Sequence, residues 1–107
     1  LDVLEHIEQK NEELFLKNTV ESLTPHGIAI IGMPSLESQA YASEQSKIGH
    51  VNCKSAPDLK VLLEGFFHNV FIFSMNDEVV HTGYHKMAHY IFAVCATRRL
   101  VSEKLKI

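Results

Sequence analysis

The sequence feature that most constrains the fold is a β-hairpin pattern in the second half of the chain. Residues 70–75 read Val-Phe-Ile-Phe-Ser-Met, a run rich in the β-branched and aromatic residues that favour strands. Asn76 and Asp77 supply a tight turn, and residues 78–82 continue as the partner strand until Gly83 interrupts it. This pattern predicts a sheet that is at least partly antiparallel.

A strong helix signal precedes the hairpin. Ser55 suits the N-cap position, Pro57 falls in the first turn, and Asp58 follows the cap by three residues. Residue types in this order satisfy the free N–H groups that open a helix. Gly65 ends the helix as a C-cap. The apolar face of this predicted helix consists of Leu59, Leu62 and Leu63.

The N-terminal part of the chain predicts a helix followed by a buried strand. Over residues 2–22 an apolar stripe recurs at helical spacing, with Glu and Lys at many of the other positions. The stripe consists of Val3, Leu4, Ile7, Leu14 and Phe15. Residues 24–27 end this helix, because proline disfavours helical geometry in the residue before it. Residues 28–33 form a continuous apolar run, which predicts a strand buried on both faces at the centre of a sheet.

The remaining segments complete an α+β pattern. Residues 36–50 are polar and poorly periodic, so both a strand and a short helix fit them, whereas residues 84–104 predict a final helix. The order is α-β-(β)-α-β-β-α, an α+β class with a mainly antiparallel sheet and N-terminal, middle and C-terminal helices. Small sensory and adaptor domains of the PAS, profilin-like and roadblock types share this layout, which is an analogy of layout alone. The length of 107 residues suits a single domain over 1–107, with an amphipathic helix at 1–22 and an α+β body at 26–107.

Charge and cysteine content exclude some functions. The net charge of −3 and the sequence pI near 6.1 provide no basic field, so we expect no nucleic-acid partner. No apolar run approaches the roughly 20 residues that span a bilayer, and the acidic amphipathic N-terminus is unlike a signal peptide. We therefore expect no membrane association. Two cysteines, Cys53 and Cys95, suit a reducing cytoplasm, although one long-range disulfide stays open.

The densest cluster of chemically capable residues holds His81, His85 and His89. Histidine is the commonest metal ligand and ionises near neutral pH. In an unbroken helix, His81 and His89 would lie about 12 Å apart along the axis, too far to bind one ion together. Only a fold at Gly83 would join all three, with Asp77, Glu78 or a water molecule as a fourth ligand. We therefore expect no cofactor, and a divalent transition metal at the three histidines stays an alternative.

The predicted final helix is apolar on two sides, which indicates either a central helix or one that a partner covers. One side is expected to pack in the core, which leaves the thiol of Cys95 buried and inert. That side consists of Tyr84, Met87, Ala88, Ile91, Val94 and Cys95. The other side consists of His85, His89, Phe92, Ala93, Ala96 and Leu100. From this second side we expect ligand or partner contacts at His85, His89, Phe92, Ala96 and Leu100.

These features favour a small, non-enzymatic binding or regulatory domain of the cytoplasm, either sensory or adaptor. It would act through helix-mediated homodimerisation or a protein partner, and a small molecule also fits as a ligand. One alternative is a metal-binding protein or small metalloenzyme that uses His81, His85 and His89. A second alternative is a metal-free enzyme in which a histidine is the general acid or base, aided by a residue of the hairpin turn or by Tyr84. No complete catalytic motif is present in the sequence, so no catalytic residue is assigned.

Overall fold

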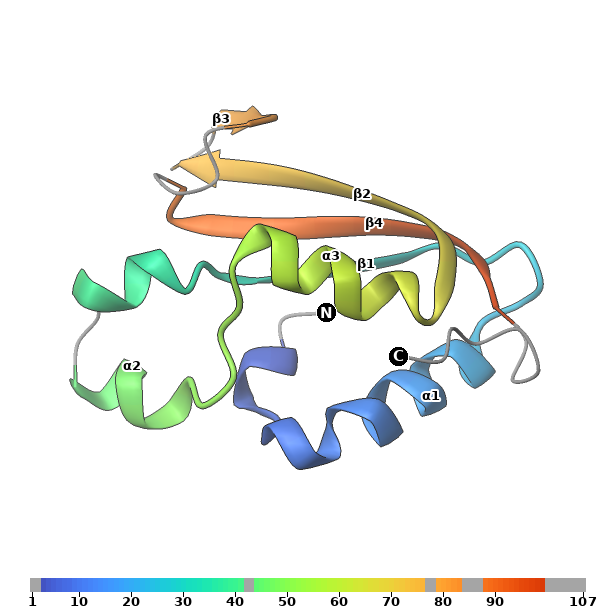
Figure 1. Cartoon of the computed structure of the whole chain (residues 1–107), viewed down its shortest axis with the longest axis horizontal. Helices are drawn as coiled ribbons and strands as arrows, with labels where there is room; N and C mark the ends of the chain where they lie inside the picture. The colour runs from blue at the N-terminus through green and yellow to red at the C-terminus, as the bar shows by residue number, and fades with distance from the viewer. Residues whose placement is uncertain (1–2, 42–43, 77–78, 84–87, 100–107) are drawn as a thin grey trace.

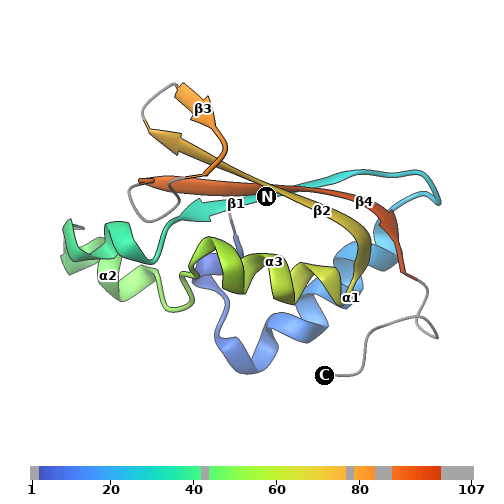
Figure 2. The same ribbon diagram turned by 45° about the horizontal axis from the view of Figure 1, so that its top comes forward.

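The computed structural model describes residues 3–41, 44–76, 79–83 and 88–99. It has two layers: a four-stranded antiparallel sheet, with α1, α2 and α3 all on one side of it (Figures 1 and 2). The α+β class and the antiparallel sheet are therefore confirmed. The elements are η1 (Leu4–His6), η2 (Gln9–Asn11), α1 (Glu12–Ser22), β1 (Ala29–Pro34), η3 (Glu37–Tyr41), α2 (Glu44–Gly49), α3 (Ala56–Glu64), β2 (Phe67–Asn76), β3 (Val79–His81) and β4 (Tyr90–Arg98), where η marks a 3-10 turn.

The sheet has the strand order β1-β4-β2-β3. The last strand, β4, lies between β1 and β2, and it is antiparallel to both. Side chains alternate between the two faces of a strand, so this register assigns each strand residue to one face. The face that packs against the helices is called the covered face here. Its members are Ala29, Ile31 and Met33 from β1, Val70, Ile72 and Ser74 from β2, and Ile91, Ala93 and Cys95 from β4.

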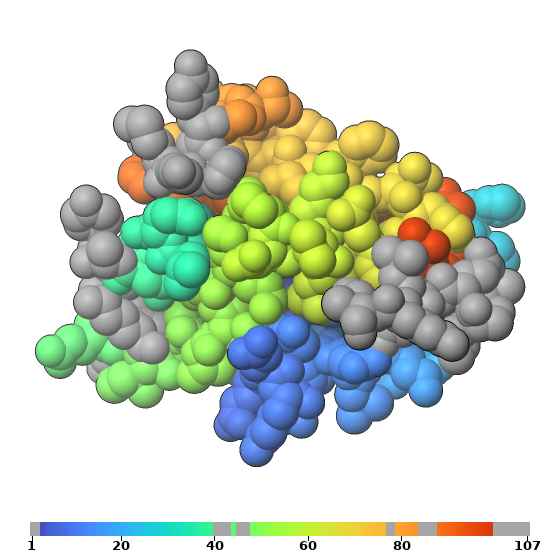
Figure 3. Space-filling view, viewed as in Figure 1, coloured from blue at the N-terminus to red at the C-terminus, as the bar shows by residue number. Residues whose placement is uncertain are grey.

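The core lies between the covered face and the helices. Leu59 and Leu63 of α3 and Leu16 of α1 are fully buried in it, as are Ile31 and Ile91 of the sheet. The space-filling view shows α3 in the middle of the helical side, between the N-terminal helices and β2 (Figure 3). Burying the leucines of α3 against strands from both halves of the chain fixes the helix on the sheet.

The helix predicted after Ser55 is confirmed at both ends. The Ser55 hydroxyl accepts a hydrogen bond from the backbone N–H of Asp58 at 3.4 Å, and Pro57 lies in the first turn. At the other end, the N–H of Gly65 donates to the carbonyls of Leu62 and Leu63. Both helix ends therefore satisfy backbone groups that the helix itself leaves free.

The prediction of a helix over residues 84–104 is wrong where the structure describes the chain, because residues 90–98 form β4. Residues 84–87 and 100–107 lie outside the described residues. A strand that is buried on one face and apolar on the other has apolar residues on both of its sides. A helix with two apolar sides gives a similar sequence pattern, so the pattern does not distinguish the two. The change of geometry exchanges two positions: Ala93 belongs to the core, whereas Val94 leaves it.

The first strand is also placed differently from its prediction. β1 is an edge strand, which pairs with β4 alone, and not a central one. The side chain of Ile30 is 56% exposed, so the run is not buried on both faces. An apolar run therefore marked a strand correctly, but it did not show that both of its faces are covered.

Two helical predictions need correction as well. Residues 2–22 do not form one helix, because Ile7 and Glu8 take extended backbone geometry and separate η1 from η2 and α1. The predicted stripe therefore fails in part: Leu4 is buried but Leu14 is exposed. Residues 36–50, which fitted either a strand or a short helix, are helical as η3 and α2.

Candidate binding surface on the open face of the sheet

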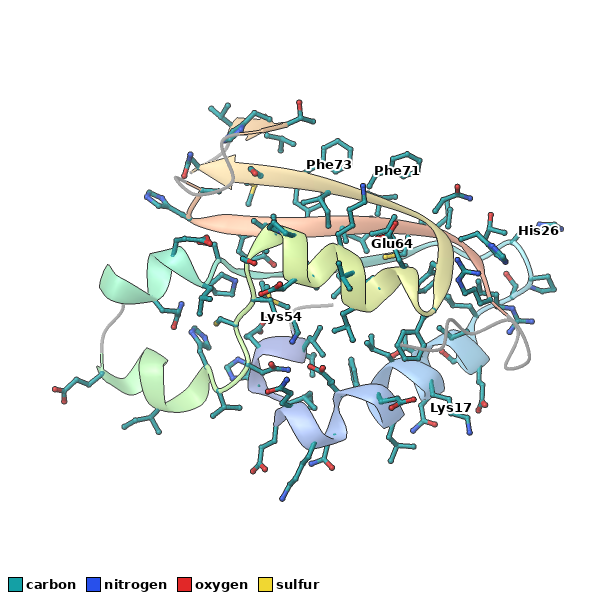
Figure 4. The ribbon with its side chains drawn as sticks, in the orientation of Figure 1. Lys17, His26, Lys54, Glu64, Phe71 and Phe73 are labelled. Atoms are coloured by element: carbon teal, nitrogen blue, oxygen red, sulfur yellow. The ribbon has the colours of Figure 1, made fainter. Side chains whose placement is uncertain are left out.

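Apolar side chains line the other side of the sheet, where no helix of the described residues lies. In the register, Phe73 is opposite Phe92, and Phe71 and Ile30 are both opposite Val94. Figure 4 shows Phe71 and Phe73 on the side of β2 that is turned away from α3. We call this surface the outer face. Its members are Ile30, Gly32, Pro34, Asn69, Phe71, Phe73, Met75, Val80, Tyr90, Phe92, Val94 and Ala96.

Several of these side chains are widely exposed. Phe71 is 57% exposed and Val80 is 51% exposed, and Ile28, just before β1, is also exposed. Phe73 and Phe92 stack on each other, with ring centroids 5.3 Å apart and planes inclined at 19°. The aromatic pair lies across β2 and β4, the two inner strands, so the apolar surface is continuous over the middle of the sheet.

Tyr90 extends this surface over the edge strand. A Cβ atom placed on Gly32 would lie 2.5 Å from the Tyr90 Oη and 2.8 Å from its Cε1. The tyrosine ring therefore lies over the backbone of Gly32, and only glycine leaves room for it. The ring covers β1 where that strand has no side chain of its own.

Among the described residues, the outer face contains no charged side chain. β4 carries one charged residue, Arg98, and its guanidinium Nη1 donates to the carbonyl of Val20 in α1, at 3.3 Å. Arg98 therefore points toward the helices. Asn69, opposite Ala96, is polar and donates to Thr97 Oγ1 at 3.2 Å. The other members of the outer face are apolar, aromatic or glycine residues, which is the composition of a protein-binding surface more than of a solvated one.

The residues expected to contact a ligand or partner are only partly brought together. Phe92 and Ala96 both lie on the outer face, because positions four apart share a face in a strand as they do in a helix. Both side chains are half-buried. His89 is exposed just before β4, and its backbone N–H donates to Asn76 Oδ1 at 2.9 Å. His85 and Leu100 lie outside the described residues.

The histidine cluster is described only in part. His81 ends β3, and its ring Nε2 lies 3.5 Å from Asn76 Nδ2, so Asn76 contacts both His81 and the backbone of His89. Within 3–41, 44–76, 79–83 and 88–99, no three or more His, Cys, Asp or Glu residues are grouped to hold a metal ion. His85, Asp77 and Glu78 fall outside these ranges, so the metal alternative stays a prediction.

A second polar cluster, which no sequence signal indicated, lies on the helical side. The Lys54 ammonium is 3.1 Å from Glu12 Oε2, and it also donates to Asn52 Oδ1 at 3.2 Å. Asn52 Nδ2 donates to the same Glu12 oxygen at 2.7 Å, and the backbone N–H of Asn52 donates to the Glu5 carbonyl. Figure 4 shows Lys54 beside the N-terminal segment. Glu12 and Asn52 are 40 positions apart in the chain, so spacing could not predict this contact.

His6 forms a further link between the same two segments. Its Nδ1 lies 2.6 Å from the carbonyl oxygen of Gly49, and its Nε2 lies 3.5 Å from Glu5 Oε1. A carbonyl only accepts, so Nδ1 is the donor in the first contact. The ring of His50 lies against that of His6, with centroids 4.9 Å apart. The cluster fastens η1 to the end of α2.

Neither cysteine is activated. Burial, followed by the negative charge of Glu5, raises the pKa of the Cys53 thiol. Burial alone raises the pKa of Cys95 to about 12. Since the thiolate is the nucleophilic form, both side chains are poor nucleophiles at neutral pH. Both are free, so the disulfide that the sequence left open is not formed, and the predicted burial of Cys95 is confirmed.

No protein-family model, curated protein or solved structure matches the chain. Within the part that the structure describes, no helix combines the length and the apolar character needed to cross a membrane.

Proposed function

We propose that this chain is a small, non-enzymatic binding domain of the cytoplasm, and that its outer face pairs with the outer face of a second copy. The observation that carries the proposal is the continuous apolar surface over β1, β4 and β2 on the side without helices. Monomeric soluble proteins rarely leave such a surface open to water. Covering it would remove exposed apolar area at a gain of about 25 cal/mol per Å².

The absence of charge on the outer face favours a second copy as the occupant. In a two-fold dimer the same patch meets itself, so any charged side chain near the axis would face a like charge. The described residues of the outer face include none, although the chain as a whole carries a net charge of −3. Two such faces would pack about 10 Å apart, as the sheets of a sandwich do.

The polar groups on the helical side support a structural role for that layer. Glu12 and Lys54 pair with each other and with Asn52 at a position where both charged side chains are nearly buried. A buried pair of this kind fixes the connection between the N-terminal segment and residues 50–54. We therefore assign binding to the outer face. The polar groups of the helical layer hold the N-terminal segment against residues 50–54.

The test compares two substitutions of exposed apolar residues by glutamate. Phe71→Glu places a charge in the middle of the outer face, and Leu14→Glu places one on the exposed side of α1, where the leucine is 62% exposed. We expect sedimentation of the wild type to give a dimer at micromolar concentration. Phe71→Glu should sediment as a monomer, because an unpaired charge at an interface is costly, whereas Leu14→Glu should remain dimeric.

Ala96→Glu provides a second variant on the same face, at the other inner strand. Circular dichroism and a urea titration would show that each variant is folded. A wild type that sediments as a monomer at high micromolar concentration would contradict pairing with a second copy. Equal behaviour of Phe71→Glu and Leu14→Glu would show instead that a dimer forms elsewhere.

A further inference from the structure

We propose that a small apolar carboxylate binds in a hollow on the helical side, between the start of α3 and the end of β2. The hollow measures about 300 Å³ and is lined by Ala56, Pro57, Lys60, Ile72, Ser74 and Gly83. It lies on the opposite side of the sheet from the outer face, so the proposal stands whether or not two copies pair.

The walls of the hollow are mainly apolar, and most of the lining residues belong to α3 and β2. Ala56 and Pro57 belong to the first turn of α3, which the Ser55 cap holds in place. Ile72 lies on β2, packed against the core. A Cβ atom placed on Gly83 would meet nothing within 4 Å, so the space beside this residue is open. An apolar ligand group would therefore enter without displacing a core side chain.

Two polar groups set the chemistry of the ligand. Ser74 lines the hollow and is 2% exposed. Lys60 is exposed, and it is the one charged residue among the described residues that line the hollow. Among the described residues, Lys60 takes part in no salt bridge. An unpaired ammonium beside an apolar hollow selects an anion with an apolar body.

The volume limits the size of that body. A hollow of about 300 Å³ is at the lower end of the volumes of small-molecule sites. This size favours a short chain such as octanoate over a long-chain fatty acid. The carboxylate would lie near Lys60, and the hydrocarbon chain would lie along Ile72.

The experiment uses octanoate as the probe, with octanol as its neutral counterpart, in amide NMR titrations of the full chain. We expect saturable shifts at Ala56, Ser74 and Gly83, with octanoate bound about fivefold more tightly than octanol. That ratio corresponds to one partly exposed charge contact. Lys60→Met should remove the preference, Lys60→Arg should keep it, and Lys17→Met should leave it unchanged. Lys17 is an exposed lysine on α1 and serves as the matched control (Figure 4).

Three results would overturn the proposal. Shifts confined to Phe71, Val94 and their neighbours would place the probe on the outer face. Equal weakening by Lys60→Met and Lys17→Met would show a general effect of charge. Shifts that grow linearly without saturation would show that no site exists. The oligomeric state does not enter any of these readouts, so failure here is distinct from failure of the dimer.

Discussion

The two faces of the same sheet differ in what covers them but hardly in what they are made of. Along β4, Ile91 and Cys95 point toward the helices and are fully buried, while their neighbours Phe92 and Val94 point away and are only half-buried. Both sets are apolar. The strands therefore carry more apolar surface than the described helices cover, and the uncovered part lies on the outer face.

Two substitutions on opposite faces of β4 test whether the two faces contribute differently to stability. Ile91→Ala removes a fully buried side chain and leaves a cavity, so we expect a loss of about 2–5 kcal/mol in the free energy of unfolding. Val94→Ala lies on the outer face and should cost less than about 1 kcal/mol in the dilute protein. Urea unfolding at low protein concentration measures both. Equal losses would mean that something covers the outer face within one chain.

The pH dependence of stability tests the burial of the Cys95 thiol on the covered face. Burial raises the pKa of Cys95 from its ordinary 9.0 to about 12, so the folded protein keeps a proton that the unfolded chain releases. The stability that this thiol contributes is complete below pH 9.0 and is lost as the pH rises through about 12.

We therefore expect the free energy of unfolding to fall above pH 9, by at most about 1.4 kcal/mol per pH unit from one thiol. Urea titrations at pH 8, 9 and 10 should show a shallower fall for Cys95→Ala than for the wild type. The variant should also be less stable at pH 7, because it leaves a cavity. Cys53→Ala is the control at a half-buried position, where the pKa is raised but the side chain is outside the core. Identical slopes in the wild type and Cys95→Ala would contradict the burial of the thiol.

The smallest expected effect on stability concerns the N-cap of α3, the helix that packs on the covered face. Ser55→Ala removes the oxygen that accepts from the Asp58 N–H, and we expect a loss of about 1 kcal/mol in stability. The oligomeric state should not change, because Ser55 is on the helical side. Ser55→Asn keeps a capping side chain and should retain most of the stability. An unchanged denaturation midpoint for Ser55→Ala would show that the cap contributes nothing.

Local signals in the sequence predicted the elements whose cause is itself local. The cap at Ser55 and the stop at Gly65 satisfy backbone groups within a few residues, so α3 could be placed closely. The strand character of residues 70–75 follows from β-branched and aromatic side chains, and β2 contains them. The sharing of one face by Phe92 and Ala96 also survived, since helix and strand both bring positions four apart together.

Residue patterns along the chain were enough to predict the α+β class, the middle helix, the hairpin strand β2 and the apolar character of residues 91–96. Tertiary structure decided that these last residues form a strand in the middle of the sheet, because two flanking strands supply the hydrogen bonds that a helix would have made within itself. Tertiary structure also decided which face is covered, and it joined Glu12, Asn52 and Lys54. Burying either apolar face would be favourable, so the residue pattern does not distinguish the two faces. The packing of segments that are distant in the chain determines which face is buried.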